Sequence, residues 1–379
     1  MDLDNCRIKI DEIDDEILQL FKKRIEIAKD MAKYKADNNL PVFNPQRERE
    51  ILYRVCSSCD EETQNFTKIL FGTIIDITRT YQSTLIKGKN PIVGGIKKSL
   101  ENKMKSFPQT AYVACQGIEG AYSQIAADSF FSAPKIMYMN TFDGVFRAVE
   151  KGLCAYGVLP IENSTAGSVT EVYELMKKYH FHIARSVKLR INHVLLAREN
   201  VKFGDIKEIF SHEQAITQCS GFLKDNPQVK VTVCENTAVA AKVVADSGRT
   251  DVAALSSKNC AGIYNLSVLS NEVQNSDNNY TRFICISKDL QIYNGADKIS
   301  LMLTLDNKAG ALYSLLTKFS VLGLNLTKLE SRPMKGTDFE FMFYFDVDGS
   351  VEDEKVLDLI GQLADSTDYF DFLGNYGEA

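Results

Sequence analysis

The spacing of apolar residues over the first 34 positions constrains the fold more than any other feature of the sequence. These residues step by four and three, with one step of seven, at Cys6, Ile10, Ile13, Ile17, Leu20, Ile27, Met31 and Tyr34. A period near 3.6 residues indicates one long amphipathic α-helix. We expect this helix to stop near Pro41, because proline lacks the amide hydrogen that a helix interior needs.

Two further helices are expected in the same segment. Asn44 offers an N-cap and Pro45 a first helical residue for the second helix, and the third covers roughly 62–86. Three helices of such unequal length bury little core on their own. Residues 1–88 therefore predict an all-α domain that associates with a second copy of the chain.

The composition and the hydrophobic pattern of the remaining sequence change at two further points. Residues 89–109 are basic, contain Gly and Pro, and are weakly periodic, which indicates a linker. In 110–288 short apolar runs alternate with helical patterns, which predicts an α/β domain of two lobes. Residues 298–376 read as βαββα, with a final strand from Tyr369, at the size of a small α+β regulatory domain.

Charge and cysteine content exclude several classes of protein. Lys and Arg number 44 and Asp and Glu 50, so the net charge of −6 provides no general attraction to nucleic acid. No apolar run approaches the roughly 18 residues of a membrane span, and the acidic start lacks the apolar core of a secretory signal. The nine scattered cysteines are expected to be reduced thiols, and neither Cys nor His spacing predicts a metal site. We expect a cytoplasmic protein without a membrane partner.

Two cations lie on the apolar stripe of the first helix. Arg24 continues the four-three stepping, and Lys35 follows eleven residues later, about three turns on and nearly on the same face. A guanidinium in an apolar stripe is unfavourable unless it is paired, and no acidic residue shares the stripe. Either the two cations bind a small anion, or Arg24 extends to solvent from the edge of a helix–helix interface.

Polar groups of the α/β segment follow its strands. They lie in 116–123, 160–164, 211–214 with Gln218 beyond, 235–237 and 279–283. Ligands of open α/β sheets bind at such loops, near helix N-termini that favour anions. Each loop also has a structural interpretation, since Ser123, Ser211 and Thr237 are good N-caps and Glu162 can form a loop salt bridge.

The helical segment resembles the chorismate mutase domain of the all-helical class. The resemblance covers residues 1–88 and depends on Arg7, Arg24 and Lys35, on NPQRERE from Asn44, and on TRTYQ at 78–82. It implies that Arg7 and Arg24 hold the two carboxylates of chorismate, and that the catalytic residues Lys35 and Gln82 donate to the ether oxygen. A Claisen rearrangement needs a folded dianion and positive charge at that oxygen, without nucleophile or cofactor.

Three more residues complete the implied chorismate pocket. Glu48 would bind the ring hydroxyl, and Asn44 and Thr78 would line the site. Thr78 and Gln82 are four residues apart on one helix, so they can face the same ligand. Asn44 and Thr78 stand where the pattern has Asp and Ser, and an N-cap role accounts fully for Asn44.

The middle segment resembles the prephenate dehydratase family. The motifs GxxGxYS, PIENS, SHxQAxxQC, ENTAxAA and NYTRF occur in the family's order over about 110–287. The resemblance implies two α/β lobes with the substrate between them, as in periplasmic binding proteins. It also implies loss of the ring hydroxyl as water and of the ring carboxylate as CO2, which leaves phenylpyruvate, without a cofactor.

This second resemblance also implies roles for individual residues. A hydroxyl leaves readily only if a proton reaches it, and the pattern gives that role to Thr281, as the donor itself or as part of a relay. Arg282 would bind a carboxylate with its guanidinium fork. The residues that would bind or orient prephenate are Glu162, Asn163, Ser211, Gln218, Thr281 and Arg282.

The C-terminal segment resembles the ACT domain attached to such dehydratases. The resemblance rests on GALY, NLT and ESRP, and it implies phenylalanine binding at a domain interface through Gly310, Ala311, Leu312, Asn325, Leu326, Glu330, Ser331 and Arg332. Gly310 would be needed for close backbone approach, and Asn325 can pair with the amino and carboxyl groups of the ligand. Ala309 stands where the common pattern has Pro. A ligand-free oligomerisation domain is the alternative.

Together the three segments predict one chain that carries out both reactions under phenylalanine feedback, as a homodimer or tetramer. A fusion with prephenate dehydrogenase would need a GxGxxG fingerprint, which the sequence lacks. A non-catalytic amino-acid sensor would have no use for Lys35, Gln82 and Thr281.

The distance between Arg7 and Arg24 along the first helix predicts that the two subunits of the dimer share their mutase sites. They are seventeen residues apart, about 26 Å of axial rise on one helix, which is too far for both to reach one small ligand. We therefore expect Arg7 to enter the mutase site of the other subunit.

Overall fold

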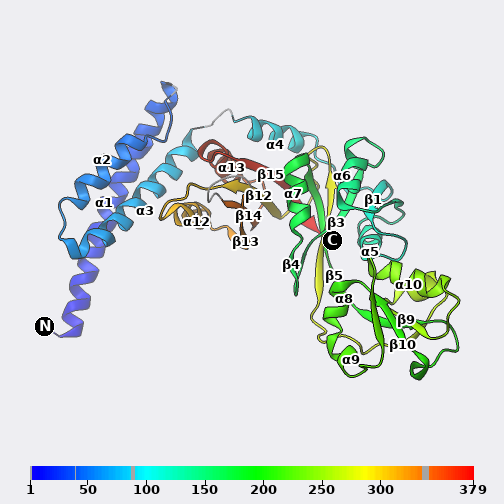
Figure 1. The fold of residues 1–379 in the computed structure, drawn as a ribbon. Helices are drawn as coiled ribbons and strands as arrows, with labels where there is room; N and C mark the ends of the chain where they lie inside the picture. Colours follow the sequence, from blue (N-terminus) through cyan, green and yellow to red (C-terminus); the bar gives the residue numbers. More distant parts are fainter. Residues whose placement is uncertain (1, 39, 87–89, 335–340) are drawn as a thin grey trace. The chain divides into compact units, whose positions relative to one another are not determined.

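The computed structural model describes residues 2–38, 40–86, 90–334 and 341–379 (Figure 1). The chain divides into two compact units. The first comprises Met1–Glu101 and Ile299–Phe372, and the second comprises Asn102–Lys298 and Leu373–Ala379. The predicted boundary between 88 and 89 lies outside the described residues.

The N-terminal segment of the first unit is helical, as predicted. It forms α1 (Leu3–Asp37), α2 (Pro45–Cys56) and α3 (Glu61–Leu85), and α3 packs against both other helices. The Asn44 side chain caps α2 by accepting a 3.0 Å hydrogen bond from the Arg47 amide, so the N-cap interpretation of Asn44 is correct.

Most of the apolar stripe of α1 faces solvent within this chain. Only Ala28 and Ala32 of the helix are buried. The exposed large residues, each more than half accessible, include Ile10, Ile13, Ile17, Leu20 and Ile27. A stripe of this length is unusual on a monomer, and association with a second copy stays the prediction that accounts for it.

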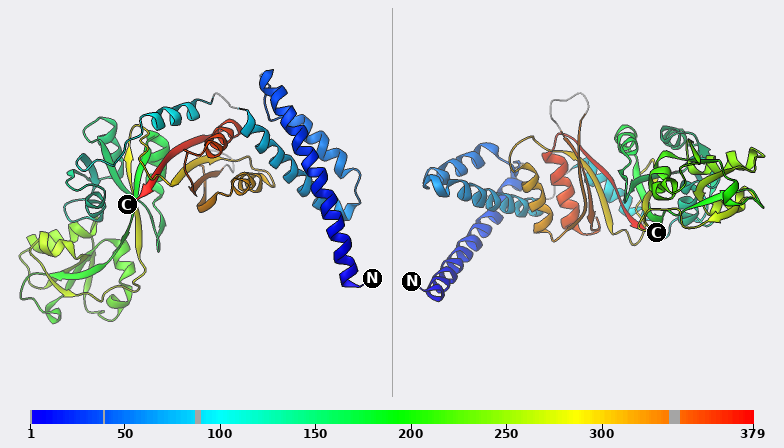
Figure 2. Two further views of the ribbon diagram at one scale, coloured as in Figure 1. Left: turned by 180° about the vertical axis from the view of Figure 1, so that it is seen from behind. Right: turned by 60° about the horizontal axis from the view of Figure 1, so that its bottom comes forward.

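The C-terminal segment has the predicted order of strands and helices. Its elements are β12 (Lys298–Thr304), α12 (Ala311–Val321), β13 (Asn325–Pro333), β14 (Phe341–Asp348), α13 (Glu354–Ser366) and β15 (Phe370–Glu378). The strands lie in the order β13-β14-β12-β15, with α12 and α13 side by side (Figure 2). Both helices contact α3, which joins this segment to the mutase-like helices within one unit.

The segment expected to be a linker contains a helix, α4 (Pro91–Glu101), that packs on α13. Val93 and Ile96 are buried there, and a Cβ at Gly361 would lie 3.0 Å from the Val93 side chain. This helix was not predicted, because the sequence is weakly periodic and contains the Gly pair at 94–95. Only two residues provide its buried face.

The first lobe of the second unit is a mixed sheet. Its strands are β1 (Tyr112–Gln116), β2 (Lys135–Met139), β3 (Tyr156–Asn163), β4 (Gly167–Ser168), β5 (His182–Arg190) and β11 (Tyr280–Ser287), in the order β5-β11-β3-β1-β2 with β4 beside β3. Helix α5 (Tyr122–Phe130) covers one face, and α6 (Phe142–Glu150) and α7 (Thr170–Tyr179) cover the other.

The second lobe is a five-stranded sheet with its own core. The strand order is β10-β6-β9-β7-β8. Its elements are β6 (His193–Ala197), η1 (Phe203–Asp205), β7 (Glu208–Ser211), α8 (Glu213–Gln218), α9 (Ser220–Lys224), β8 (Lys230–Val233), α10 (Thr237–Asp246), β9 (Val252–Ser257), α11 (Asn259–Ile263) and β10 (Ser267–Ser270). The chain passes between the lobes twice, from β5 to β6 and from β10 to β11, so the predicted two-lobed α/β arrangement is confirmed.

The end of the chain belongs to the second unit rather than to the C-terminal segment. Gly377 and Glu378 of β15 pair in parallel with β5, and Tyr376 is fully buried. A side chain at Gly374, whose φ is +150°, would collide with the carbonyl oxygen of Ile183. The predicted C-terminal region 298–376 thus does not coincide with the division into units.

No helix in the described ranges combines the length and apolarity needed to cross a bilayer. All nine cysteines are free thiols, and among the described residues no group of three or more His, Cys, Asp or Glu side chains could hold a metal ion.

Candidate active sites

Two helices of the first unit bring Arg24, Lys35, Thr78 and Gln82 together. Lys35 Nζ donates to Gln82 Oε1 at 3.1 Å and to the Val42 carbonyl oxygen at 2.7 Å. Arg24 Nε donates to Thr78 Oγ1 at 3.3 Å. Thr78 and Gln82 are buried on one face of α3, as their spacing predicted.

The two cations of this site lack a carboxylate partner. Neither Arg24 nor Lys35 forms an ion pair with any residue that the structure describes. Burial lowers the pKa of Arg24, and the nearby Arg54 lowers it further. Burial also lowers the pKa of Lys35, against the opposing effect of Glu48. Partly desolvated positive charges of this kind favour a bound anion.

Glu48 is held by a residue that the sequence did not single out. Arg79 Nη1 donates to both carboxylate oxygens of Glu48, at 2.9 and 3.1 Å, and Arg79 also pairs with Asp76. Burial nevertheless raises the pKa of Glu48, because desolvation outweighs the opposing charge of Arg79. The spacing of Asp76 and Arg79, one helical turn apart, was the available signal.

Arg7 lies away from this pocket in the single chain. It is exposed near the start of α1 and pairs with Asp4 at 3.1 Å. Because α1 is continuous from Leu3 to Asp37, the axial separation from Arg24 stays about 26 Å.

A polar network centres on Thr281 and Asn163 in the second unit. These two residues lie directly opposite each other on β11 and β3. Asn163 Nδ2 donates to Thr281 Oγ1 and to Asn279 Oδ1, both at 2.8 Å. Thr281 Oγ1 accepts this bond, and among the described residues no acceptor takes its own proton. The Thr281 hydroxyl is therefore buried, oriented and able to donate.

The network continues to the second lobe through Gln218 of α8. Asn279 Nδ2 donates to Gln218 Oε1 at 2.9 Å, and Gln218 Nε2 donates to Thr165 Oγ1 at 3.1 Å. His193 Nε2 lies 3.1 Å from the same Gln218 oxygen. Burial lowers the pKa of His193 to about 4, so the ring is neutral at pH 7. Asn279, Thr165 and His193 were not predicted as site residues, although Asn279 begins the NYTRF motif and Thr165 directly follows PIENS.

The other prephenate candidates lie elsewhere. Arg282 and Glu162 are paired on β11 and β3, with Nε and Oε1 3.3 Å apart. Successive residues of a strand point to opposite faces, so this pair lies on the other face of the sheet from Thr281 and Asn163. Ser211 is fully buried, and its hydroxyl donates to the Leu255 carbonyl oxygen at 2.7 Å. Strand alternation therefore separates Arg282 and Glu162 from Thr281 and Asn163, and the contact of this pair and of Ser211 with prephenate stays a prediction.

The regulatory candidates lie on α12 and β13. Gly310 has φ +86°, a conformation that favours glycine, and the space beside it is open in the single chain, so its predicted close approach to a ligand stays a prediction. Asn325 Nδ2 donates to Asp348 Oδ2 at 2.9 Å, and Arg332 Nη2 pairs with Glu330 Oε1 at 2.6 Å.

These features define a class of protein: a helical domain with a cationic pocket, joined to a two-lobed α/β domain with a buried polar network that links its lobes. Models of two families match the same segments. The chorismate mutase type II model matches residues 6–83, and the prephenate dehydratase model matches residues 113–291.

Relatives with both segments match the whole chain. The bifunctional chorismate mutase/prephenate dehydratase of Aquifex aeolicus (strain VF5) is 32% identical over 381 residues, covering 100% of this chain and 98% of the relative. The enzyme of the same name from Escherichia coli (strain K12) is 30% identical and covers 98% and 95%. The solved prephenate dehydratase from Arthrobacter aurescens in complex with L-Phe is 28% identical, with a TM-score of 0.64, covering 71% of this chain and 89% of that chain.

The chain belongs to the bifunctional chorismate mutase/prephenate dehydratase family. It is an enzyme with both activities, and the predicted pair of reactions is confirmed.

Proposed function

We propose that Arg24, Lys35, Glu48, Thr78 and Gln82 form the chorismate site of the mutase domain. The observation that carries this proposal is the pair of partly buried cations without a carboxylate partner among the described residues. A dicarboxylate substrate supplies the missing negative charge. It is held in the folded conformer that the rearrangement requires.

Lys35 and Gln82 act on the ether oxygen of chorismate. Since Gln82 Oε1 accepts from Lys35, its Nε2 is directed to donate elsewhere, and both side chains can donate to one oxygen. That oxygen gains negative charge as its bond breaks, so two fixed donors stabilise the transition state more than the ground state. Glu48, held by Arg79, accepts from the ring hydroxyl.

The mutase site is completed by Arg7 from a second copy of the chain. The exposed apolar stripe of α1 supports association through this helix, and the separation of Arg7 from Arg24 supports a shared site. Asn44 acts as a helix cap and lines the site with its amide group.

In the dehydratase domain, Thr281 delivers the proton to the leaving ring hydroxyl. The C–CO2 bond supplies the electron pair that makes the ring aromatic, and the hydroxyl leaves as water. Asn163 orients Thr281, and Gln218 links the two lobes around the substrate. Arg282 and Glu162 position these strands from the opposite face of the sheet, and Ser211 supports β7 and β9.

Phenylalanine inhibits the dehydratase by binding the ACT-like segment, through the loop at Gly310–Leu312 and strand β13. The L-Phe complex of the Arthrobacter relative supports this proposal. We further propose a cytoplasmic homo-oligomer with functional regions at 1–88, 110–288 and 298–376.

One assay on the full chain tests the assignment. Chorismate is supplied, and prephenate and phenylpyruvate are followed separately by chromatography. Arg24→Ala should remove prephenate formation while the enzyme still converts added prephenate. A variant that loses both reactions while remaining folded would contradict two independent sites.

A further inference from the structure

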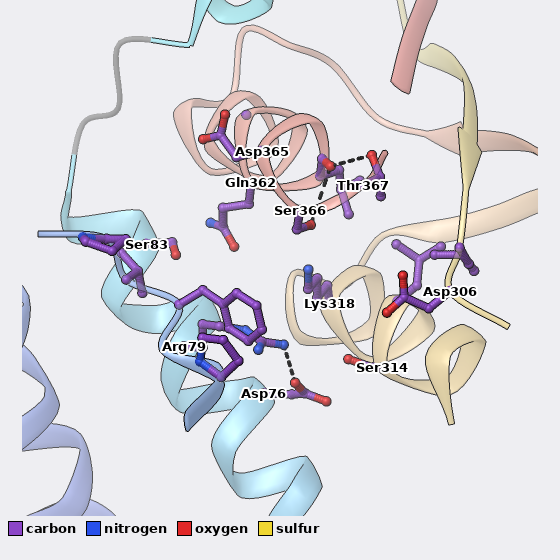
Figure 3. A pocket seen from close by; sticks show the side chains of 18 of the residues that line it. Asp76, Arg79, Ser83, Asp306, Ser314, Lys318, Gln362, Asp365, Ser366 and Thr367 are labelled. Carbon is purple, nitrogen blue, oxygen red and sulfur yellow. Dashed lines mark hydrogen bonds and ion pairs between the residues drawn. The ribbon is translucent and has the colours of Figure 1, made fainter. Parts of the chain in front are cut away.

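The first unit contains a cavity of about 890 Å³ between α2 and α3 on one side and α12 and α13 on the other (Figure 3). This volume is within the range of sites for small organic molecules. The cavity adjoins the proposed mutase site without coinciding with it, because Glu48 lines the cavity whereas Arg24, Lys35 and Gln82 do not.

Lys318 brings an unusual charge into this cavity. Its side chain on α12 is only 8% exposed, and it forms no hydrogen bond or ion pair with any residue in the described ranges. Burial lowers the pKa of Lys318 to about 8, and Arg79 adds to this effect against the opposing charges of Asp76 and Glu48. An ammonium in this position, without an ion pair, favours an acceptor in the cavity beside it.

Gln362 provides a second unsatisfied donor. Its Nε2 is buried and has no hydrogen-bond partner within the part of the chain that the structure describes. Figure 3 shows Gln362 on α13 and Lys318 on α12. Because the Gln362 nitrogen is buried out of reach of the cavity, Lys318 is the donor that a ligand there can contact.

The surroundings limit what this acceptor can be. Four further carboxylates line the cavity, at Asp306, Asp358, Asp365 and Asp368. Five cations line it as well, at Arg49, Arg79, Lys97, Lys308 and Lys318, against six carboxylates in all, so the lining is close to neutral and favours a singly charged ligand over a multiply charged anion such as a phosphate. The apolar part of the lining includes Val42, Phe43, Leu52, Val93, Leu315 and Leu363. A single carboxylate can accept from Lys318, and an apolar body attached to it fits the rest of the lining.

We propose that this cavity binds a small monocarboxylate with an apolar body, whose carboxylate is held by Lys318, and that its binding changes the mutase site through Arg79 and Glu48. The connection is short: Arg79 lines the cavity and donates to both oxygens of Glu48. The proposed binding of the ligand depends only on the cavity and its lining, and not on the role of Glu48. The effect on catalysis rests on the proposed role of Glu48.

The location of the ligand can be tested directly with 4-bromophenylacetate as the probe. Crystals of the full chain are soaked with it, and bromine is located by anomalous scattering. The expected result is a bromine peak inside the cavity with the carboxylate in hydrogen-bond reach of Lys318 Nζ. Bromine found only elsewhere, or nowhere, at millimolar probe would overturn the proposal.

Affinity in solution tests the role of Lys318. We expect Lys318→Met to weaken probe binding, measured by calorimetry, by about tenfold or more, since a hydrogen bond to a charged group is lost. Lys355→Met, which removes an exposed lysine of α13 outside the cavity, is the matched control and should bind normally. Lys318→Arg keeps the charge and checks that folding is intact. Equal binding by the uncharged 2-(4-bromophenyl)ethanol would refute carboxylate recognition.

Kinetics separate this proposal from the mutase assignment. Saturating probe should change KM for chorismate at least twofold in the parent enzyme and in Lys355→Met, and should leave KM unchanged in Lys318→Met. Probe binding in the cavity without any change in KM would overturn the coupling. Failure of the mutase assignment itself would appear independently, as normal prephenate formation by Arg24→Ala.

Discussion

The two proposed active sites differ in charge. The proposed mutase site presents two cations, Arg24 and Lys35, which form no ion pair with any described residue. The proposed dehydratase site presents a neutral network, from Thr281 through Asn163 to Gln218 and a neutral His193. The first reaction requires stabilisation of charge on an oxygen, and the second requires a proton at a defined place, so the two residue sets follow the two kinds of chemistry.

The difference also concerns rigidity. Asn163 is fixed by its bonds to Thr281 and Asn279 and by three bonds that its Oδ1 accepts from Thr165 and Ala166. By contrast, Arg24 has a single 3.3 Å bond to Thr78. We infer that the dehydratase geometry is set by the fold, whereas the mutase geometry is completed by substrate and by a second subunit.

The largest difference between the two activities is expected from Thr281→Ala. Removing the buried donor should lower dehydratase kcat by roughly a thousandfold, the scale of a lost general acid, and leave mutase activity near normal. The measurement is the separate rate of each reaction in the full chain. Thr327→Ala, at an exposed position of β13, is a matched control with full dehydratase activity expected. Equal loss of both activities in Thr281→Ala would point to misfolding.

The shared mutase site can be tested by mixing inactive chains. Arg7→Ala and Arg24→Ala should each lack mutase activity alone. Refolded together, half of the dimers are hybrids with one intact site of two, so about a quarter of the parental activity should return. Mass spectrometry counts the hybrids. Hybrid dimers without recovered activity would mean that both arginines serve the site of one chain.

Phenylalanine control should respond to a smaller change on β13. Arg332→Ala should raise the phenylalanine concentration for half-inhibition of the dehydratase by about tenfold, as expected for a lost charged hydrogen bond. Lys355→Met is the control. A substitution is preferable to truncation before Lys298, because Leu373–Ala379 complete the sheet of the second unit. Unchanged inhibition in Arg332→Ala would place the phenylalanine site elsewhere.

The smallest effect at neutral pH is expected from His193. Its pKa is lowered from 6.5 to about 4 by burial, so the unfolded chain takes up a proton first as the pH falls. The free energy of unfolding should therefore be unaffected above pH 6.5 and fall by up to about 3 kcal/mol between pH 6.5 and 4. His193→Gln stays neutral and should lose this part of the pH dependence in denaturant titrations. Identical pH profiles for both proteins would contradict a buried neutral ring.

Much of the secondary structure and both reactions could be predicted from the sequence, because local patterns of residues specify them. The four-three stepping predicted α1, Asn44 and Pro45 predicted the start of α2, and the C-terminal order of strands and helices was correct through β15. The order of the family motifs predicted both reactions. These features depend on residues close together in the chain, where spacing and capping determine structure directly.

Other features were decided only by the tertiary structure. From sequence, PIENS and NYTRF are predicted to be loops, in which neighbours such as Thr281 and Arg282 can share a ligand. In the fold β3 extends to Asn163 and β11 begins at Tyr280, so strand alternation sends these neighbours to opposite faces. The Arg79–Glu48 pair, α4 against α13, and β15 beside β5 likewise join residues far apart in the chain. The sequence by itself determined which chemical groups are present and in what order. Only the packing of strands and helices decided which of them meet, because such contacts depend on long-range burial that local spacing does not encode.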